Sequence, residues 1–423
     1  MYMKNKVLFI SDDIRGTSGV SHISKTIVTQ TSDVFDWVQL SAMKEHPEKN
    51  SVVDVSNSVT ELTGYLDCYV RLYPMSGYGD EITLRNLIAL ESPDAILHMS
   101  DPRNFNWLYE MDMELRDNIP LCYYHVWDND PIPTYNTPLY ESCDWIGCIN
   151  KKTHEYVKQL APTTTTEYIP HGVSSDIFYN ITNADETSQL RDMILGTDCV
   201  YDFVVFCNNV NTPRKRLADL LLSMETFASC HSDKKICLLC HINPNSVPIY
   251  NLRKLAVEMC PSVEILFTNN SVSLNDINKL YNIADITVNI ASNEGFGLST
   301  LESLMAETPI LATDTGGLSD QMYGDDLVVG DWAYAIQPDV RRMNGNDSVL
   351  YIYEDLCNAD SIVSGLNYWF GKSKEERLTA GSLGRKHAIK HFNSVDMIDS
   401  IKHGITTAIE SHTQHSMSKI VKL

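Results

Sequence analysis

Short apolar runs alternate with helix-length amphipathic stretches along the chain, and few folds accommodate this order. A parallel β-sheet with helices on both faces does, because its strands are buried on both sides and its crossovers need helices. The sequence therefore predicts an α/β protein. In the first half, the expected strands are Val7–Ser11, Trp37–Ser41, Cys68–Tyr73, Ala95–Met99, Leu121–Val126, Trp145–Asn150 and Tyr168–His171.

A second series of apolar runs predicts a second sheet. Its expected strands are Phe203–Cys207, Ile236–His241, Val263–Phe267, Ile286–Ile290, Ile310–Thr313 and Leu327–Val329. The 423 residues also exceed what one hydrophobic core comfortably serves. We predict two doubly wound, Rossmann-like domains, residues 1–175 and 203–394, facing each other across a cleft that receives ligands. Residues 176–202 would form the linker, and a C-terminal helix of about 395–423 could pack back on the first domain.

Composition excludes several classes of protein. The formal net charge is −22, which rules out a polybasic binder of nucleic acid or anionic membranes. No apolar run approaches the roughly 18 residues of a membrane-spanning helix, and Val7–Ile10 is too short for a signal peptide. We expect a cytoplasmic protein without integral membrane contact. The 11 cysteines lie mostly in strand-like runs, so reduced core thiols are expected. The haem-like and redox-like spacing in Cys237–His241 also falls inside such a run.

A glycine loop between a strand and a helix is the most informative segment. Gly295 and Gly297 allow backbone amides to approach a ligand, and the helix that begins near Gly297 offers free N–H groups and a positive dipole end. A phosphate group suits this place. Glu294 and Glu302 flank the loop, and the eight residue steps from one to the other would span about 12 Å of helix. This exceeds the ~5–9.5 Å of a hydrolytic carboxylate pair, so the two carboxylates should hold two parts of one extended ligand.

The Glu-x7-Glu spacing, with Gly-Phe-Gly after Glu294, resembles the donor site of retaining nucleotide-sugar glycosyltransferases of the large family 4 type, which have the GT-B fold. The resemblance covers nearly the whole chain and is weakest over residues 40–90 and 330–380. It implies that Glu294 binds hydroxyls of the donor sugar and that Glu302 binds the ribose. The further donor-binding residues that it implies are Gly295, Phe296, Gly297, Leu298 and Ser299.

The segment Phe206–Arg216 resembles the diphosphate-binding loop of the same family, in which an early arginine and a later lysine face the phosphates. Lys215 matches the lysine. Asn209 stands where the arginine is usual, so Arg214 is the candidate for the missing charge. Fixed cations here would stabilise the negative charge on the departing β-phosphate without a metal ion or another cofactor. The donor would be a UDP- or GDP-linked sugar.

In the first domain, Arg15–Val20 resembles the glycine loop of the family that closes on the phosphates and the acceptor, which makes Gly16 and Gly19 candidate binding residues. His98 and His125 both end expected strands. The resemblance favours His125 as the histidine that faces the transferred sugar and the acceptor.

No metal site is predicted. Asp128-Asn129-Asp130 has the Asp-x-Asp pattern that binds a metal ion in the other, single-domain glycosyltransferase architecture, but here it belongs to a proline-bounded loop that could face the acceptor. His387 and His391 have helical spacing but lack a nearby third ligand.

The resemblance therefore implies a retaining hexosyl- or pentosyltransferase with Glu294, His125 and Lys215 as catalytic residues. A front-side displacement, in which the leaving phosphate takes the proton of the acceptor, fits them best. The acceptor could be a glycan, a small molecule or a hydroxylated base in DNA. The DNA acceptor is suggested by the segments Ile10–Ser21 and Tyr124–Pro131, which resemble uncharacterised glycosyltransferases of large tailed phages. A phage origin would place the protein in the host cytoplasm. A nucleotide-sugar epimerase, or a catalytically degenerate GT-B protein that binds a partner, stays open as an alternative, as does the oligomeric state.

Overall fold

The computed structural model describes residues 4–197, 200–243, 251–268, 272–347 and 349–420. Its first sheet has the strand order β3-β4-β2-β1-β5-β6-β7-β8, and only β3 runs antiparallel to its neighbour. The strands are β1 (Asn5–Asp12), β2 (Phe35–Met43), β3 (Val53–Asp54), β4 (Val70–Ser76), β5 (Ala95–Ser100), β6 (Leu121–His125), β7 (Trp145–Cys148) and β8 (Thr165–Tyr168).

Helices cover both faces of this sheet, because alternate residues of each buried strand point to opposite sides. Val7 and Phe9 pack with the helices α1, α2 and α16, whereas Leu8 and Ile10 pack in a separate cluster with α3 to α7. The helices of this half are α1 (Gly19–Thr31), α2 (Ser56–Thr63), α3 (Glu81–Glu91), η1 (Pro102–Phe105), α4 (Asn106–Glu110), α5 (Asp112–Leu115), η2 (Thr134–Asn136), α6 (Thr137–Glu141) and α7 (Lys151–Leu160).

The second sheet is entirely parallel, with the order β11-β10-β9-β12-β13-β14. Its strands are β9 (Phe203–Asn208), β10 (Ile236–His241), β11 (Glu264–Phe267), β12 (Ile286–Asn289), β13 (Ile310–Thr313) and β14 (Ala333–Ile336). The helices around it are α8 (Ala184–Leu195), η3 (Pro213–Lys215), α9 (Leu217–Cys230), α10 (Leu252–Met259), α11 (Leu274–Ile283), α12 (Leu298–Met305), α13 (Gly316–Met322), α14 (Ala359–Phe370) and α15 (Lys374–His391).

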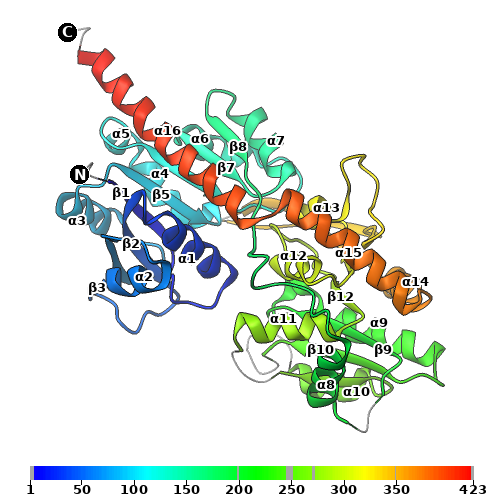
Figure 1. Ribbon diagram of the computed structural model, residues 1–423. Coiled ribbons are helices and arrows are strands. Elements are labelled where there is room, and N and C mark those ends of the chain that lie inside the picture. Colours follow the sequence, from blue (N-terminus) through cyan, green and yellow to red (C-terminus); the bar gives the residue numbers. More distant parts are fainter. Residues whose placement is uncertain (1–3, 198–199, 244–250, 269–271, 348, 421–423) are drawn as a thin grey trace.

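The chain returns from the second lobe to the first through its last helices (Figure 1). After α15, the long helix α16 (Ser394–Ile420) lies against α1, β5, β6 and β7. At the crossing, a Cβ on Gly172 would overlap the backbone of Asn393 and Ser394, so glycine lets the two chain segments that join the lobes pass in contact. The C-terminal helix therefore completes one face of the first sheet.

Two expected strands are wrong. The strand expected at Tyr168–His171 is β8, which lies earlier, at Thr165–Tyr168. It is a polar, partly exposed edge strand without the apolar run that marks a buried one. Leu327–Val329 is no strand, because Leu327 is 77% exposed and has φ +62° in a turn. The last strand of the sheet is instead β14, which holds the buried Ala333 and Ile336.

The region where the resemblance is weakest holds a feature that the sequence analysis did not predict. Strands β15 (Val340–Asn346) and β16 (Val349–Leu356) form an antiparallel hairpin beyond the second sheet. The stretch expected as a linker also contains structure. Helix α8 lies within it and packs on α11, and the backbone amides of Tyr179 and Ile181 donate to Asn278 and Asn282 of α11.

None of the described cysteines forms a disulfide, and Cys237 and Cys240 are buried in β10, as a core role requires. In the part of the chain that the structure describes, no helix is both long and apolar enough to cross a membrane.

Candidate functional site

The glycine loop lies between β12 and α12, at the carboxyl end of the second sheet. Gly297 is the N-cap of α12 with φ +91°, and a Cβ there would lie 2.5 Å from Leu318 Cδ2 and 2.9 Å from Thr300 Oγ1. Only glycine fits both constraints. The first-turn amides of α12, at Leu298 and Ser299, have no acceptor within the helix. The predicted strand, glycine loop and helix are therefore present, with an N-terminus suited to an anion.

Glu294, at the start of this loop, is held by two cations. The ammonium of Lys215 forms a very short ion pair with Glu294 Oε2, and Arg214 Nη1 lies 3.3 Å from the same oxygen. The side chains of Lys215 and Glu294 are only 9% and 10% exposed, whereas that of Arg214 is 44% exposed. Burial alone would raise the pKa of Glu294, but Lys215 and Arg214 outweigh it and lower this pKa to about 2. Glu294 is thus a carboxylate at neutral pH.

The loop after β9 presents these cations. Lys215 ends the 3₁₀ turn η3, and the following Arg216, with φ +55°, redirects the chain into α9. The backbone of Arg214 accepts a hydrogen bond from the amide of Ser292, 2.7 Å away, and its Nη1 donates to the carbonyl of Asn293 at 2.7 Å. The two loops are therefore tied together. Arg216 instead pairs with Asp219 on its own helix.

Asn209, at the usual arginine position, does not join this cluster. Its side-chain amide lies 3.6 Å from Cys207 Sγ, and its backbone amide donates to the carbonyl of His241. Among the residues that the structure describes, Arg214 is the arginine that reaches Glu294, as the sequence analysis suggested for the missing charge.

Glu302 lies on α12 in surroundings without a cation. It accepts hydrogen bonds from the hydroxyl of Tyr281, at 2.7 Å, and from Nδ2 of Asn208, at 3.3 Å. Burial raises the pKa of Glu302 to about 7, although these two donors oppose the shift. The sequence analysis missed Asn208 and Tyr281. The position of Asn208 at the end of β9 was the available signal for it.

The first-domain glycine loop meets the donor loop directly. A Cβ on Gly19 would lie 3.2 Å from Leu298 Cδ1, which brings the start of α1 next to the start of α12. Gly16 donates its amide to the carbonyl of Asp13, and a Cβ there would overlap the side chain of Ser21. Tight packing thus favours glycine at position 16, whereas at position 19 a side chain would press on Leu298.

His125 and His98 are both fully buried in the first domain. His125 Nε2 lies 3.0 Å from the hydroxyl of Tyr140, and its Nδ1 has no partner among the described residues. Burial, with His98 nearby, lowers the pKa of His125 to about 3, so the ring is neutral. His98 is paired in the same way with Tyr109, at 2.8 Å. His125 lies in an aromatic cluster rather than in the cluster around Glu294, and its assigned role stays a prediction.

Further contacts between the lobes surround the donor loop. Asn150 Nδ2 donates to the carbonyl of Gly295 at 2.8 Å, and the amide of Lys151 donates to Asp320 at 2.8 Å. Phe296 packs edge-on against His171, with ring centroids 5.3 Å apart. These residues hold the two lobes together. Asn150, Lys151 and Phe296 were not singled out as interdomain contacts, because nothing in their local sequence indicates a partner so distant in the chain.

The Asp-x-Asp pair is divided in the structure. Asp130 is engaged by Lys152 at 2.8 Å and by the hydroxyl of Tyr156, whereas Asp128 bonds to neither of these two residues. Within the described ranges, no three histidine, cysteine or acidic side chains gather as metal ligands would.

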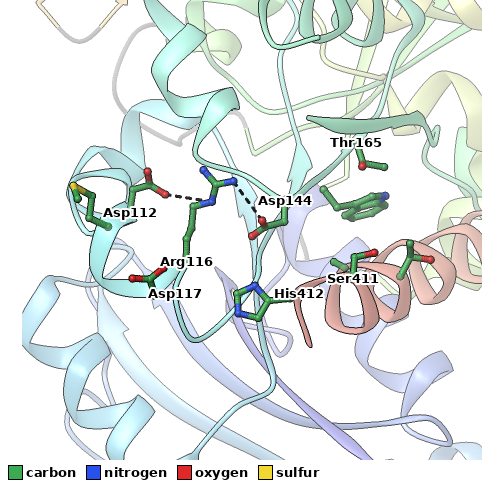
Figure 2. A pocket seen from close by; sticks show the side chains of 11 residues that line it. Asp112, Arg116, Asp117, Asp144, Thr165, Ser411 and His412 are labelled. Atoms are coloured by element: carbon green, nitrogen blue, oxygen red, sulfur yellow. Dashed lines mark hydrogen bonds and ion pairs between the residues drawn. The ribbon is translucent and has the colours of Figure 1, made fainter. Parts of the chain in front are cut away.

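A cavity of about 520 Å³ lies elsewhere, between α5, the first residues of β7 and β8, and α16 (Figure 2). Asp112, Asp117, Asp144 and Arg116 line it, and Arg116 lies 3.6 Å from Asp112 and 3.5 Å from Asp144. The cavity is at the amino end of β7 and β8 in the first sheet, whereas Glu294 and Lys215 follow strands of the second sheet, and it shares no residue with the candidate donor site.

Comparison with known proteins agrees with the placement of the candidate donor site at Lys215, Glu294 and the glycine loop. Residues 204–325 match the family model described as Glycosyl transferases group 1, and this segment contains Asn209, Arg214, Lys215, Glu294 to Ser299 and Glu302. A comparison with curated protein sequences finds no match.

Several solved structures share the whole fold. A glycosyltransferase from Rickettsia africae is 14% identical with a TM-score of 0.68, over 96% of this chain and 99% of that one. Sucrose-phosphate synthase from Thermosynechococcus elongatus is 11% identical with a TM-score of 0.68, over 97% and 100%. Anabaena HepE in complex with UDP-glucose is 14% identical with a TM-score of 0.66, over 95% and 99%. The predicted α/β fold of GT-B type, with two Rossmann-like domains, is confirmed. The fold and the matched segment together support a GT-B glycosyltransferase.

Proposed function

We propose that this protein transfers a sugar from a nucleotide-diphosphate sugar to a hydroxyl acceptor with retention of anomeric configuration. One observation carries the proposal: the Lys215–Glu294–Arg214 cluster lies beside the N-terminus of α12, within the segment that matches the glycosyltransferase family. UDP is the proposed nucleotide, because Anabaena HepE is described in complex with UDP-glucose and a similar Escherichia coli protein with UDP-2-fluoro glucose.

The cluster provides separate places for the parts of such a donor. The diphosphate would lie between Arg214, Lys215 and the free amides of α12, where fixed positive charge stabilises the departing phosphate. Glu294 would accept hydrogen bonds from the sugar hydroxyls, and Glu302 from the ribose. Because Lys215 pairs directly with Glu294, a bound diphosphate would share this cation with the carboxylate. The binding places of the diphosphate and of the sugar would therefore be adjacent.

Retention would follow from a front-side displacement at the anomeric carbon. The bond from this carbon to the β-phosphate oxygen breaks, and its electron pair leaves with the nucleoside diphosphate. The acceptor oxygen forms the new bond on the same face of the sugar. Two cations and a helix N-terminus would supply this charge stabilisation at the proposed phosphate position.

The decisive experiment is calorimetric titration with UDP and with GDP in the presence of EDTA, followed by an assay of nucleotide release from the matching sugars. We expect micromolar UDP binding, with transfer reduced at least 100-fold in Glu294→Gln and in Lys215→Ala. Lys234→Ala is the control, because Lys234 forms only surface ion pairs. Circular dichroism establishes that the variants fold. Unimpaired transfer in both site variants would contradict the proposed site.

The products also decide the finer proposals. Glycans, small hydroxylated molecules and DNA with hydroxylated bases are compared as acceptors, and the anomeric configuration of the product is read by NMR. A changed sugar without any acceptor would support a nucleotide-sugar epimerase, and the absence of nucleotide binding would support a catalytically degenerate protein. Activity on hydroxylated DNA alone would support a role in phage DNA modification in the host cytoplasm.

A further inference from the structure

Asp128 lies where the first lobe meets the donor loop. It follows β6, and its carbonyl would be 3.1 Å from a Cβ placed on Gly316, where the same Cβ would overlap the carbonyl of Glu294. The backbones of Asp128 and Glu294 therefore flank one glycine. Gly316, the first residue of α13, leaves room for the two backbones, so the two acidic residues come close together across the lobes.

The residues on both sides of Asp128 are fixed. The indole of Trp127 donates to the carbonyl of Asn129 at 3.0 Å, and the carbonyl of Trp127 accepts from Asn150 Nδ2 at 2.7 Å. Asn129 Nδ2 donates to the carbonyl of Tyr353, on the hairpin of the second lobe, at 3.1 Å. Asp128 is thus positioned by a rigid frame rather than by contacts of its own side chain.

The carboxylate of Asp128 is partly buried and has no hydrogen-bond or ion-pair partner in the described parts of the chain. Other acidic residues near the contact between the lobes have hydrogen-bond or ion-pair partners. These are Asp12 with Tyr78 and Ser18, Asp13 with Arg15 and His46, Asp101 with Arg103, Asp130 with Lys152, Glu294 with Lys215 and Asp320 with the amide of Lys151. An unsatisfied carboxylate in a partly buried place costs stability, which a ligand can recover.

The charges around Asp128 suit proton transfer. Burial raises the pKa of Asp128 to about 6, and the negative charge of Glu294 adds to this effect while Arg214 opposes it. A carboxylate that titrates close to neutral pH can both exist in its ionised form and accept a proton readily.

We propose that Asp128 is the catalytic base that accepts the proton of the acceptor hydroxyl. This rests on the proposed transfer function and assigns the acceptor side of the same site. As the acceptor oxygen bonds to the anomeric carbon, the bond from that carbon to the β-phosphate oxygen breaks and the nucleoside diphosphate leaves with the electron pair. The hydroxyl proton goes to the carboxylate of Asp128 instead of to the leaving phosphate.

The position of Asp128 fits this step. Its charge interacts with that of Arg214, which we place on the diphosphate, so Asp128 belongs to the surroundings of the leaving group. A front-side displacement requires the acceptor to bind on that same side. His125 is a poorer base, because its ring is fully buried, and Asp130 is already engaged by Lys152 and Tyr156.

The test compares Asp128→Asn with Asp101→Asn. Asp101 follows the neighbouring strand β5, but its carboxylate is already paired with Arg103 at 2.6 Å. We expect Asp128→Asn to lower kcat for transfer at least 100-fold, with the Kd for UDP within twofold of the wild type, and Asp101→Asn to change kcat less than threefold. The wild-type rate should rise with pH through a limb near pH 6 that is absent in Asp128→Asn.

A second variant guards against misfolding. Asp128→Ala should regain at least tenfold in rate with added formate, which can replace the missing carboxylate, while Asp101→Ala should not respond. An Asp128→Asn variant with a rate within threefold of the wild type, an unchanged pH limb, or a sugar covalently attached to Asp128 would overturn the assignment. A wild-type protein that binds neither UDP nor GDP would instead contradict the proposed function itself.

Discussion

Glu294 and Glu302 belong to one loop and helix, yet they lie in opposite electrostatic surroundings. Two cations hold Glu294 as a carboxylate, whereas Glu302 has only the neutral donors Tyr281 and Asn208. The pKa of the first carboxyl is about 2 and that of the second about 7. The two carboxyls therefore respond to pH in different ranges, which makes Glu302 a site where nucleotide binding can be titrated.

UDP should bind more tightly as the pH rises from 6 to 8. The pKa of Glu302 is raised to about 7, so ionisation of this carboxyl in that range supplies an acceptor for both ribose hydroxyls. We expect about a tenfold fall in Kd, because the ionised fraction of a group with a pKa of about 7 rises about tenfold between pH 6 and pH 8. Calorimetry at each pH measures this change, and Glu302→Gln should remove the part of it that exceeds the titration of UDP itself. If the pH dependence of the Kd for UDP is unchanged in Glu302→Gln, this would contradict the ribose-binding role of Glu302.

Gly297→Ala should destabilise the protein more than Gly64→Ala. Both glycines have positive φ values, +91° and +73°, but only at Gly297 would a Cβ collide with its surroundings, at 2.5 Å from Leu318 Cδ2. We expect a loss of about 2–4 kcal/mol in the free energy of unfolding at Gly297 and about 1 kcal/mol at Gly64. Urea titration followed by tryptophan fluorescence measures both. Equal losses would show that the loop relaxes around the added methyl group.

At the scale of elements, the hairpin β15–β16 joins the lobes. The carbonyl of Tyr353 accepts hydrogen bonds from Asn293 in the donor loop, at 2.6 Å, and from Asn129 in the first lobe, at 3.1 Å. Tyr351 packs edge-on against Tyr135, with ring centroids 4.9 Å apart. The hairpin thus supports both sides of the candidate site without supplying a side chain to the Glu294 cluster.

Arg341→Ala should lower the free energy of unfolding by about 1–3 kcal/mol, because it leaves the 4%-exposed carboxylate of Asp355 without its cation, 2.9 Å away. Arg341 also lies 3.3 Å from Asp130 of the first lobe. Arg342→Ala is the matched control on the same strand. Arg342 is 64% exposed and 3.8 Å from Glu354, so its removal should cost less than about 0.5 kcal/mol. Chemical denaturation of the two variants gives the comparison, and a control as damaging as the test would refute the role of the buried pair.

For the whole molecule, the C-terminal helix makes the two lobes interdependent. Ile398, Ile401 and Ile405 of α16 are buried in the same cluster as Trp145 and the strands of the first sheet. A Cβ on Gly404 would overlap the Trp145 ring, so the helix lies as close to the sheet as a backbone can. The last part of the chain therefore completes the core of the first.

Ile401→Ala should cost about 2–5 kcal/mol, because the fully buried side chain would leave a cavity between α16 and the sheet. Ile389→Ala on α15 is the control, since Ile389 is 42% exposed and should cost under about 1 kcal/mol. Thermal unfolding of both variants, followed by near-ultraviolet circular dichroism, measures the effect on the Trp145 environment. Similar midpoints for Ile401→Ala and the wild type would show that α16 is not required by the first core.

Much of the fold could be predicted because its signals are local. The apolar runs that became β1, β5, β9 and β12 are buried on both faces, so each strand identifies itself without knowledge of its neighbours. The weaker strands could not be found in this way. The edge strand β8 is polar, and the hairpin strand β15 is exposed throughout, so neither carries an apolar period.

The sequence by itself determined the order of the buried strands and the glycine loop before α12, because backbone conformation at Gly297 and burial of short runs depend on neighbouring residues. Only the tertiary structure decided which charges meet. Lys215 pairs with Glu294, and Asp128 meets Glu294 beside Gly316, where the two lobes are in contact. Both contacts join residues that lie far apart in the chain. Their electrostatic properties arise from distance and burial, and packing within and between the domains sets both quantities.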